Sequence, residues 1–258
     1  MKKSILIILL TLTCCCACAR MNPYVQNQQK MAQESLGKMK RLNSFVSSAK
    51  IGIGITKNCV IFHASSYAEK FGLKPGDKII AINNEEINKQ EDIIRLIRMN
   101  KVGDSVTLRI LRNNSDLDIT AKTYDGKRED DLLKSTYEAI VDGNWKLCIQ
   151  EARSLIDNDK SLLNYDLLLQ CLSCERITKK RRPNNDEATL VYDAGRIAIK
   201  ELAYDPLLFD SIRSSIISKV DWLNRNDFKA LGNDLQKLFD EADRSSKKLI
   251  RENEEEKL

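Results

Sequence analysis

The sequence predicts an α+β domain in the first half of the chain and an all-α domain in the second. Between residues 49 and 121, short runs rich in Ile and Val alternate with Gly, Asn and Asp, which is typical of strands joined by tight turns. From Asp125 onward, apolar residues recur at helical spacing and almost no strand pattern remains. A composition of 42% apolar and 31% charged residues, with only 4 prolines, fits a helix-rich globular protein of two domains.

Residues 1–18 have the pattern of an export signal. Lys2 and Lys3 precede an apolar run over residues 5–12, which is long enough for the core of a signal peptide and too short to span a bilayer. Four cysteines follow where a signal peptidase would cut, at positions 14, 15, 16 and 18. Loss of the signal would lower the formal net charge from +5 to +3 because two lysines leave with it. That balance is too small to indicate nucleic acid as a partner.

This cysteine-rich boundary resembles the lipobox of bacterial lipoproteins, in which one cysteine becomes the first mature residue and carries lipid chains. The resemblance implies lipidation of Cys15, which has Leu12 at position −3, with Cys14 and Cys18 as alternatives. It also implies an exported protein of the bacterial cell envelope, anchored to a membrane on the periplasmic side. A plain secretory signal with incidental cysteines is the other interpretation.

Residues 19–47 are rich in Gln, Asn, Ser and Lys and predict a polar tether between the membrane and the folded part. Met31, Leu36, Met39 and Leu42 have roughly helical spacing, so one loose helix is the alternative.

The α+β domain is expected to begin with a hairpin of two strands. Ile and Gly alternate from Ile51 to Ile55, residues 56–58 predict the turn, and residues 59–62 form a second apolar run. A short helix over residues 64–71 follows, and Gly72 is expected to end it.

A tightly specified turn leads into the next strand. Pro75 fixes its own φ, Gly76 is free to take a positive φ, and Asp77 can accept hydrogen bonds from nearby backbone N–H groups. The pattern after this turn predicts a strand over 79–82, a helix over 89–99, and strands over 106–111 and 117–121.

Two segments carry more specific information, namely GLKPGDKIIAINN at residues 72–84 and VGDSVTL at residues 102–108. With the order of the elements, they resemble the PDZ domain attached to bacterial envelope proteases. The resemblance covers residues 48–124, with departures at Asn84, where the family usually has Gly, and at Tyr67-Ala68, where it usually has Pro-Ala. It implies a small, mostly antiparallel, partly open barrel with two helices.

In that family an extended peptide, often a C-terminus, adds as a strand at the sheet edge, and its carboxylate rests on backbone N–H groups of a Gly-containing loop. The resemblance implies a peptide-binding site formed by the loop and strand Ile51, Gly52, Ile53, Gly54 and Ile55, with Ile93 and Ile97 from the second helix. The alternative is that these residues only pack the domain core and that the groove is unused or filled by the chain itself.

Residues 126–250 predict six helices joined by short turns, followed by a charged tail at 251–258. The first two helices form an αα-hairpin around Asp142-Gly143-Asn144. The segment from Tyr137 to Ile156 resembles one tetratricopeptide repeat, but no second copy has the same spacing. A helical bundle without repeats is therefore the alternative.

Few residues offer catalytic or metal-binding chemistry. His63 is the single histidine and stands at the end of a predicted strand, so we expect no catalytic role for it. Cys171 and Cys174 form a C-x-x-C motif, but the motif lies within a helix, and Cys59 and Cys148 do not complete a zinc pattern. We expect buried free thiols, with a disulfide among Cys148, Cys171 and Cys174 as the alternative in an oxidising compartment. No metal or cofactor is expected.

The basic run at residues 179–182 has no interleaved aromatic residues and predicts a solvated loop between helices rather than a nucleic-acid site. The sequence as a whole predicts a lipid-anchored envelope adaptor and not an enzyme. Its PDZ groove is expected to bind C-termini or extended peptides of envelope proteins, and its helical domain other partners. The alternative is a regulatory subunit, or a degenerate relative, of a PDZ-bearing envelope protease.

Overall fold

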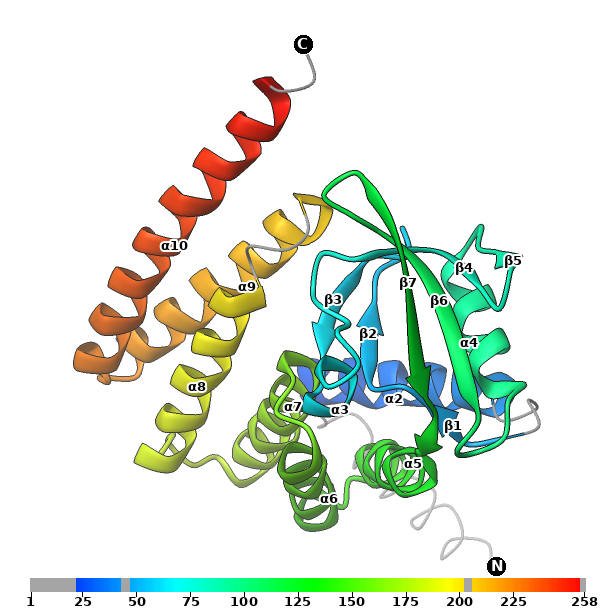
Figure 1. Cartoon of the computed structure of the whole chain (residues 1–258). Helices are drawn as coiled ribbons and strands as arrows, with labels where there is room; N and C mark the ends of the chain where they lie inside the picture. The colour runs from blue at the N-terminus through cyan, green and yellow to red at the C-terminus, as the bar shows by residue number, and fades with distance from the viewer. Residues whose placement is uncertain (1–21, 43–46, 202–205, 256–258) are drawn as a thin grey trace, which may run out of the picture.

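The computed structural model describes residues 22–42, 47–201 and 206–255 (Figure 1). The predicted signal region and the candidate lipidation sites Cys14, Cys15 and Cys18 lie outside the described residues. The predicted order of an α+β domain followed by a helical domain is confirmed.

Helix α2 (Pro23–Leu42) occupies most of the segment predicted as a tether, so that prediction is wrong for these residues. Val25 and Ala32 are buried in the core of the helical domain, and the Gln29 side chain donates a hydrogen bond to the Val141 carbonyl oxygen over 3.0 Å. Helix α2 thus packs on α5 (Lys127–Asp142) and α7 (Leu162–Lys179) of the distant helical domain. The helical spacing noted in the sequence was the correct signal, but the buried contact uses Val25 and Ala32, which lie outside that stripe.

The α+β domain contains eight strands among the described residues, in three antiparallel sheets. The largest has the order β5-β4-β6-β7, and the pairs β2-β3 and β1-β8 form the others. The strands are β1 (Ala49–Lys50), β2 (Ile53–Ile55), β3 (Ile61–Ala64), β4 (Lys78–Ile82), β5 (Glu85–Glu86), β6 (Ser105–Arg112), β7 (Ser115–Lys122) and β8 (Tyr124–Asp125). The two helices are α3 (Ser66–Glu69) and α4 (Gln90–Arg98). The sheets do not close into a barrel, as expected from the partly open fold.

The turn before β4 is confirmed and is held by a buried carboxylate. Asp77 is 1% exposed and accepts a hydrogen bond from the Lys74 N–H group over 2.8 Å. Arg112, at the end of β6, donates to both oxygens of Asp77 over 2.6 and 2.7 Å and also to the Gly72 carbonyl oxygen. Gly76 takes a φ of 91°, which the sequence anticipated. The turn is therefore tied to the end of the neighbouring strand β6 by an ion pair.

The six predicted helices of the second domain are confirmed as α5 (Lys127–Asp142), α6 (Trp145–Asn158), α7 (Leu162–Lys179), α8 (Asn185–Glu201), α9 (Pro206–Arg225) and α10 (Lys229–Glu255). Successive helices pack on one another, and α10 also packs on α8, so the last three form a bundle around a separate hydrophobic core. Helix α10 continues through most of the predicted charged tail.

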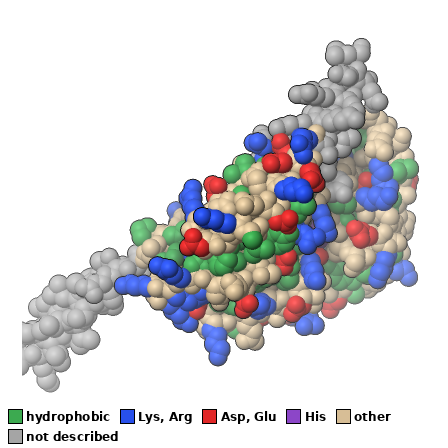
Figure 2. Space-filling model, turned by 90° about the vertical axis from the view of Figure 1, so that its left-hand side faces the viewer, with side chains coloured by type: hydrophobic (Ala, Val, Ile, Leu, Met, Phe, Trp, Pro, Cys, Tyr) green, Lys and Arg blue, Asp and Glu red, His purple; other side chains and the backbone are tan. Residues whose placement is uncertain are grey.

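The outer face of this bundle carries mixed side chains. Figure 2 views the molecule from the side on which α8, α9 and α10 lie in Figure 1, and it shows a band of hydrophobic side chains bordered by Lys, Arg, Asp and Glu.

No helix in the described ranges has the length and apolar character needed to cross a membrane.

A disulfide between Cys148 of α6 and Cys171 of α7 corrects the expectation that all these thiols are free. The two helices pack side by side and bring the two Cα atoms to 5.9 Å, within the range that a disulfide needs. Cys174 and Cys59 are free and buried. Burial raises the pKa of the Cys174 thiol to about 11.

Candidate peptide-binding groove

Strand β2 has one edge that no other strand among the described residues covers. On its other edge it pairs with β3, with Ile53 opposite Ala64 and Gly54 opposite His63. The Ser65 N–H group donates to the Gly52 carbonyl oxygen over 2.8 Å, which makes Gly52 and Ser65 a hydrogen-bonded pair. Such pairs alternate along an antiparallel ladder, so the N–H and C=O groups of Ile53 point away from β3. The open edge therefore presents the backbone of Ile53.

Helix α4 lies beside this open edge. Gln90, its first residue, donates a side-chain hydrogen bond to the Ile55 carbonyl oxygen over 3.0 Å. Ile53 and Ile55 are partly buried and pack against the same hydrophobic cluster as Ile93 and Ile97 of α4. Strand β2 and α4 thus flank the candidate peptide-binding groove, and Gln90 bounds it at the Ile55 end.

The loop that enters β2 requires glycine. Gly52 has a φ of 76°, a left-handed conformation, and a Cβ atom at this position would lie 2.1 Å from the Ser65 hydroxyl oxygen. Successive backbone N–H groups in such a turn can form a concave site for an anion. At Gly54, a Cβ atom would lie 2.7 Å from the tip of the Phe62 ring, so a larger residue there requires that ring to shift.

The structure gathers all seven predicted peptide-binding residues in one region but buries them unequally. Ile51 and Ile93 are each 1% exposed and Ile97 is 7% exposed, so these three belong to the domain core. Gly52, Ile53, Gly54 and Ile55 are partly exposed along the loop and strand. Contact between these residues and a peptide stays a prediction, with the strand backbone as its most accessible part.

Sequence reasoning missed the charged residues that join this loop to the helical domain. Lys50, directly before Ile51, forms ion pairs with Glu129 and Asp130 in the first turn of α5, at 3.0 and 2.9 Å. Asp130 also pairs with Arg98 of α4 at 2.9 Å. The only signal in the sequence was the pair of acidic residues at the N-terminus of a predicted helix, a position that favours negative charge.

Tyr124 completes this junction. Its hydroxyl group donates to Glu129 over 3.1 Å, and its ring lies 3.6 Å from the position of a Cβ atom on Gly52. Burial, followed by the negative charge of Glu129, raises the pKa of Tyr124, so the hydroxyl group stays protonated at neutral pH.

A second contact joins β3 to the end of α6. The His63 Nε2 atom lies 3.0 Å from a carboxylate oxygen of Asp159, and the two side chains are 17% and 30% exposed. The histidine therefore takes part in the interface between the domains. Within the described part of the chain, no three His, Cys, Asp or Glu side chains are grouped so as to hold a metal ion.

Comparison with known protein families matches residues 44–123 to the PDZ domain. The chain thus contains a PDZ domain over the region predicted from its sequence, and this domain indicates interaction with a peptide or protein. No curated protein matches the chain at a significant level. Lipid anchoring and a relation to envelope proteases stay predictions.

Proposed function

We propose that the chain is an adaptor that binds extended peptides by adding them as a strand along β2. The observation that carries this proposal is the open edge of β2, where the backbone of Ile53 points into the groove beside α4. Strand addition satisfies such backbone groups with main-chain hydrogen bonds, and pockets for alternate side chains provide specificity.

The geometry favours a short peptide segment that ends at the Gly52 loop. The left-handed backbone at Gly52 suits binding of a terminal carboxylate by N–H groups. Gln90 already occupies the Ile55 carbonyl oxygen, so strand pairing extends from the loop only to this point. A C-terminal peptide is therefore the preferred ligand class.

The setting that we propose is the periplasmic side of the bacterial envelope, with a lipid anchor on Cys15 or, alternatively, on Cys14 or Cys18. Support comes from the export-signal pattern and from the Cys148–Cys171 disulfide, since disulfides persist mainly in oxidising compartments. Incorporation of labelled palmitate into wild-type cells, and its loss when Cys15 is replaced by Ser, would test the anchor. Labelling that survives replacement of all three cysteines would contradict it.

The test of the peptide site is a pair of substitutions at Ile53. Ile53→Pro removes the N–H group that points into the groove, whereas Ile53→Ala keeps that group and shortens the side chain. Because Ile53 makes no ladder bond to β3, both variants leave the β2-β3 hydrogen bonds in place.

We expect Ile53→Pro to weaken binding of labelled C-terminal peptides by about tenfold or more relative to Ile53→Ala. The readout is fluorescence polarisation with a library of peptides with free carboxylates, and thermal unfolding checks that both variants fold. Equal affinity of the two folded variants, or no saturable binding of any library member to the wild-type chain, would contradict strand addition.

A further inference from the structure

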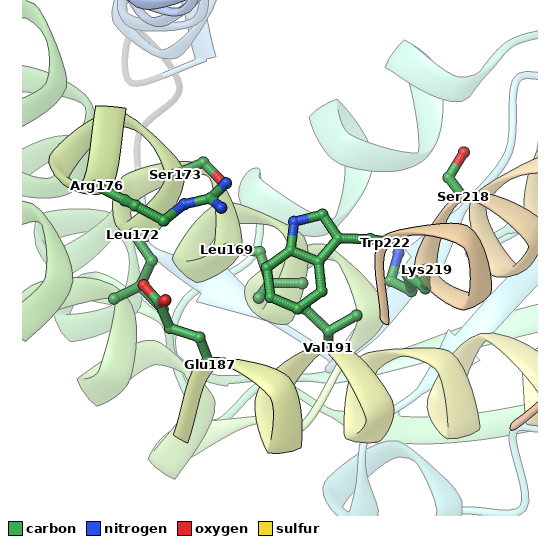
Figure 3. Close-up of a pocket in the computed structure, with 9 residues that line it drawn as sticks. All are labelled: Leu169, Leu172, Ser173, Arg176, Glu187, Val191, Ser218, Lys219 and Trp222. Atoms are coloured by element: carbon green, nitrogen blue, oxygen red, sulfur yellow. The ribbon is translucent and has the colours of Figure 1, made fainter. Parts of the chain in front are cut away.

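A small pocket in the helical domain lies between α7, α8 and α9 (Figure 3). Its volume is about 130 Å³, and its apolar lining comes from Leu169, Leu172, Val191 and Trp222. A cavity of about 150 Å³ with a similar lining can hold a benzene molecule, so this pocket has room for one apolar side chain. In Figure 3, Trp222 projects between Arg176 and Lys219.

Arg176 is the cation that this pocket offers to a ligand. Its guanidinium group lies 5.6 Å from the centre of the Trp222 ring, and no carboxylate among the described residues forms an ion pair with it. The other charged residues of the lining are already paired. Lys219 lies 2.8 Å from Asp166, and Glu187 is bound by Arg181 at 2.7 Å.

The basic run at the end of α7 adds positive charge beside Arg176. The run lies at the predicted loop between two helices, and within it Arg181 bridges Glu175 and Glu187 and so holds the turn between α7 and α8. Lys179 also pairs with Glu175. The carboxylates of Glu175 and Glu187 are thus paired with Lys179 and Arg181, whereas Lys180 and Arg182 are exposed. The turn and Arg176 together leave an excess of positive charge at this end of α7.

Tyr24 of α2 provides a second aromatic group near Arg176. Tyr24 is 42% exposed, and partial burial raises the pKa of its hydroxyl group, an effect that the charge of Arg176 opposes. Partly exposed aromatic side chains and arginine are enriched where proteins bind one another. The pocket thus combines space for one apolar side chain, one aromatic wall formed by Trp222, and unbalanced positive charge.

We propose that this pocket binds an acidic segment of a partner protein through one inserted apolar side chain. The apolar side chain contacts Leu172, Val191 and Trp222, and flanking carboxylates pair with Arg176 and the basic turn. This goes beyond the proposed function: it concerns the helical domain, for which the sequence predicted partners of its own, and it does not involve the groove beside β2. It names the partner by its chemistry, an acidic peptide with an apolar anchor.

The test uses the full chain and a labelled peptide, Asp-Glu-Glu-Phe-Glu-Asp, acetylated and amidated so that it has no terminal carboxylate for the PDZ groove. Fluorescence polarisation is expected to show saturable binding that falls by about tenfold or more in Arg176→Gln. Arg225→Gln is the matched control, because Arg225 is an 80% exposed cation on α9, and it should bind as the wild type does. A peptide with Ser in place of Phe should bind at least about tenfold more weakly.

Two further variants distinguish binding in this pocket from binding in the PDZ groove. Val191→Phe fills the pocket without changing its charge and is expected to weaken binding, with thermal unfolding as the check on folding. Ile53→Pro, which tests the PDZ groove, should leave binding of this capped peptide unchanged.

Equal affinity of the wild-type chain and Arg176→Gln, or of the Phe and Ser peptides, would overturn the proposal. So would absence of peptide binding together with binding to phosphatidylglycerol vesicles that Arg176→Gln abolishes, because that result would assign the pocket to a lipid.

Discussion

The two candidate binding regions of this protein are built from different parts of the polypeptide. The groove beside β2 offers backbone groups, which a left-handed loop at Gly52 and the ladder to β3 orient. The pocket between α7, α8 and α9 offers side chains, chiefly Trp222 and Arg176, which helices far apart in sequence bring together. Backbone recognition tolerates many peptide sequences, whereas side-chain recognition selects for charge and shape.

The two domains are also stabilised differently. A buried ion pair between Asp77 and Arg112 fixes the turn of the PDZ domain, and the Cys148–Cys171 disulfide constrains the first helices of the helical domain. The PDZ domain should therefore be sensitive to loss of one charge and the helical domain to reduction. The following predictions separate these sources of stability.

The largest effect is expected from Asp77→Ala. This change leaves the partly buried Arg112 guanidinium without its carboxylate, and breaking a buried pair in this way costs about 3 to 5 kcal/mol. Asp118→Ala is the matched control, because its ion pair with Arg109 is 45–56% exposed and should contribute about 1 kcal/mol or less. Urea unfolding measures both, and equal losses would contradict the role assigned to Asp77.

Reduction of the disulfide is expected to destabilise the helical domain by about 3 kcal/mol, because the bond closes a loop between residues 23 positions apart. Dithiothreitol should lower the denaturant midpoint of the helical domain while the PDZ domain unfolds as before. The double variant Cys148→Ala and Cys171→Ala should be insensitive to dithiothreitol, and a wild-type chain equally insensitive would show that the disulfide does not stabilise this domain.

A comparison of Gly52→Ala with Gly103→Ala isolates the steric role of the loop. Both glycines have positive φ, at 76° and 92°, so both substitutions carry a backbone cost of about 1 kcal/mol. Only the Cβ atom at position 52 meets a neighbour, the Ser65 hydroxyl group at 2.1 Å, and that overlap should add about 1 to 3 kcal/mol. Thermal unfolding measures the difference, and Ser65→Gly should relieve part of it. Equal effects at the two positions would mean that Ser65 does not restrict the loop.

The smallest effect concerns pH and the turn between α7 and α8. Burial is the largest single influence on Glu175 and raises its pKa, but the bonds from Lys179 and Arg181 together lower it below the ordinary value of 4.5. The ionised form is therefore favoured in the folded state. Its stabilisation is present above about pH 4.5 and is lost as the pH falls through the folded-state pKa.

Glu175→Gln should thus make the helical domain less stable at about pH 7 and reduce the loss of stability between about pH 5 and about pH 3. Glu138→Gln is the control, since Glu138 forms an exposed pair with Lys134. Parallel pH profiles for wild type and Glu175→Gln would rule out this contribution.

Much of the fold could be predicted because its signals are local. The turn at Pro75-Gly76-Asp77 contains its own φ constraints and hydrogen-bond acceptor, and the six helices of the second domain have clear apolar periods. The PDZ assignment followed from such local features. The left-handed backbone at Gly52 is likewise a property of one position, whereas the close approach of the Phe62 ring to Gly54 depends on the pairing of β2 with β3.

The missed features depend on partners far apart in sequence. Lys50 meets Glu129 and Asp130 only because β1 pairs with β8, which leads directly into α5. Arg112 meets Asp77 only after β6 pairs with β4. The burial of Ile93 and Ile97 likewise depends on how α4 packs on the sheets, so their spacing alone could not distinguish core residues from groove residues.

The central claim, that peptides add as a strand to β2, is tested most directly by amide hydrogen exchange with and without a saturating C-terminal peptide. The account predicts that exchange of the Ile53 amide slows by about tenfold or more, because its N–H group gains a hydrogen-bond partner. The Gly54 amide, which already faces β3, should change much less, and the amides of α7 and α8 should not change. Bound peptide with no slowing at Ile53 would contradict the account.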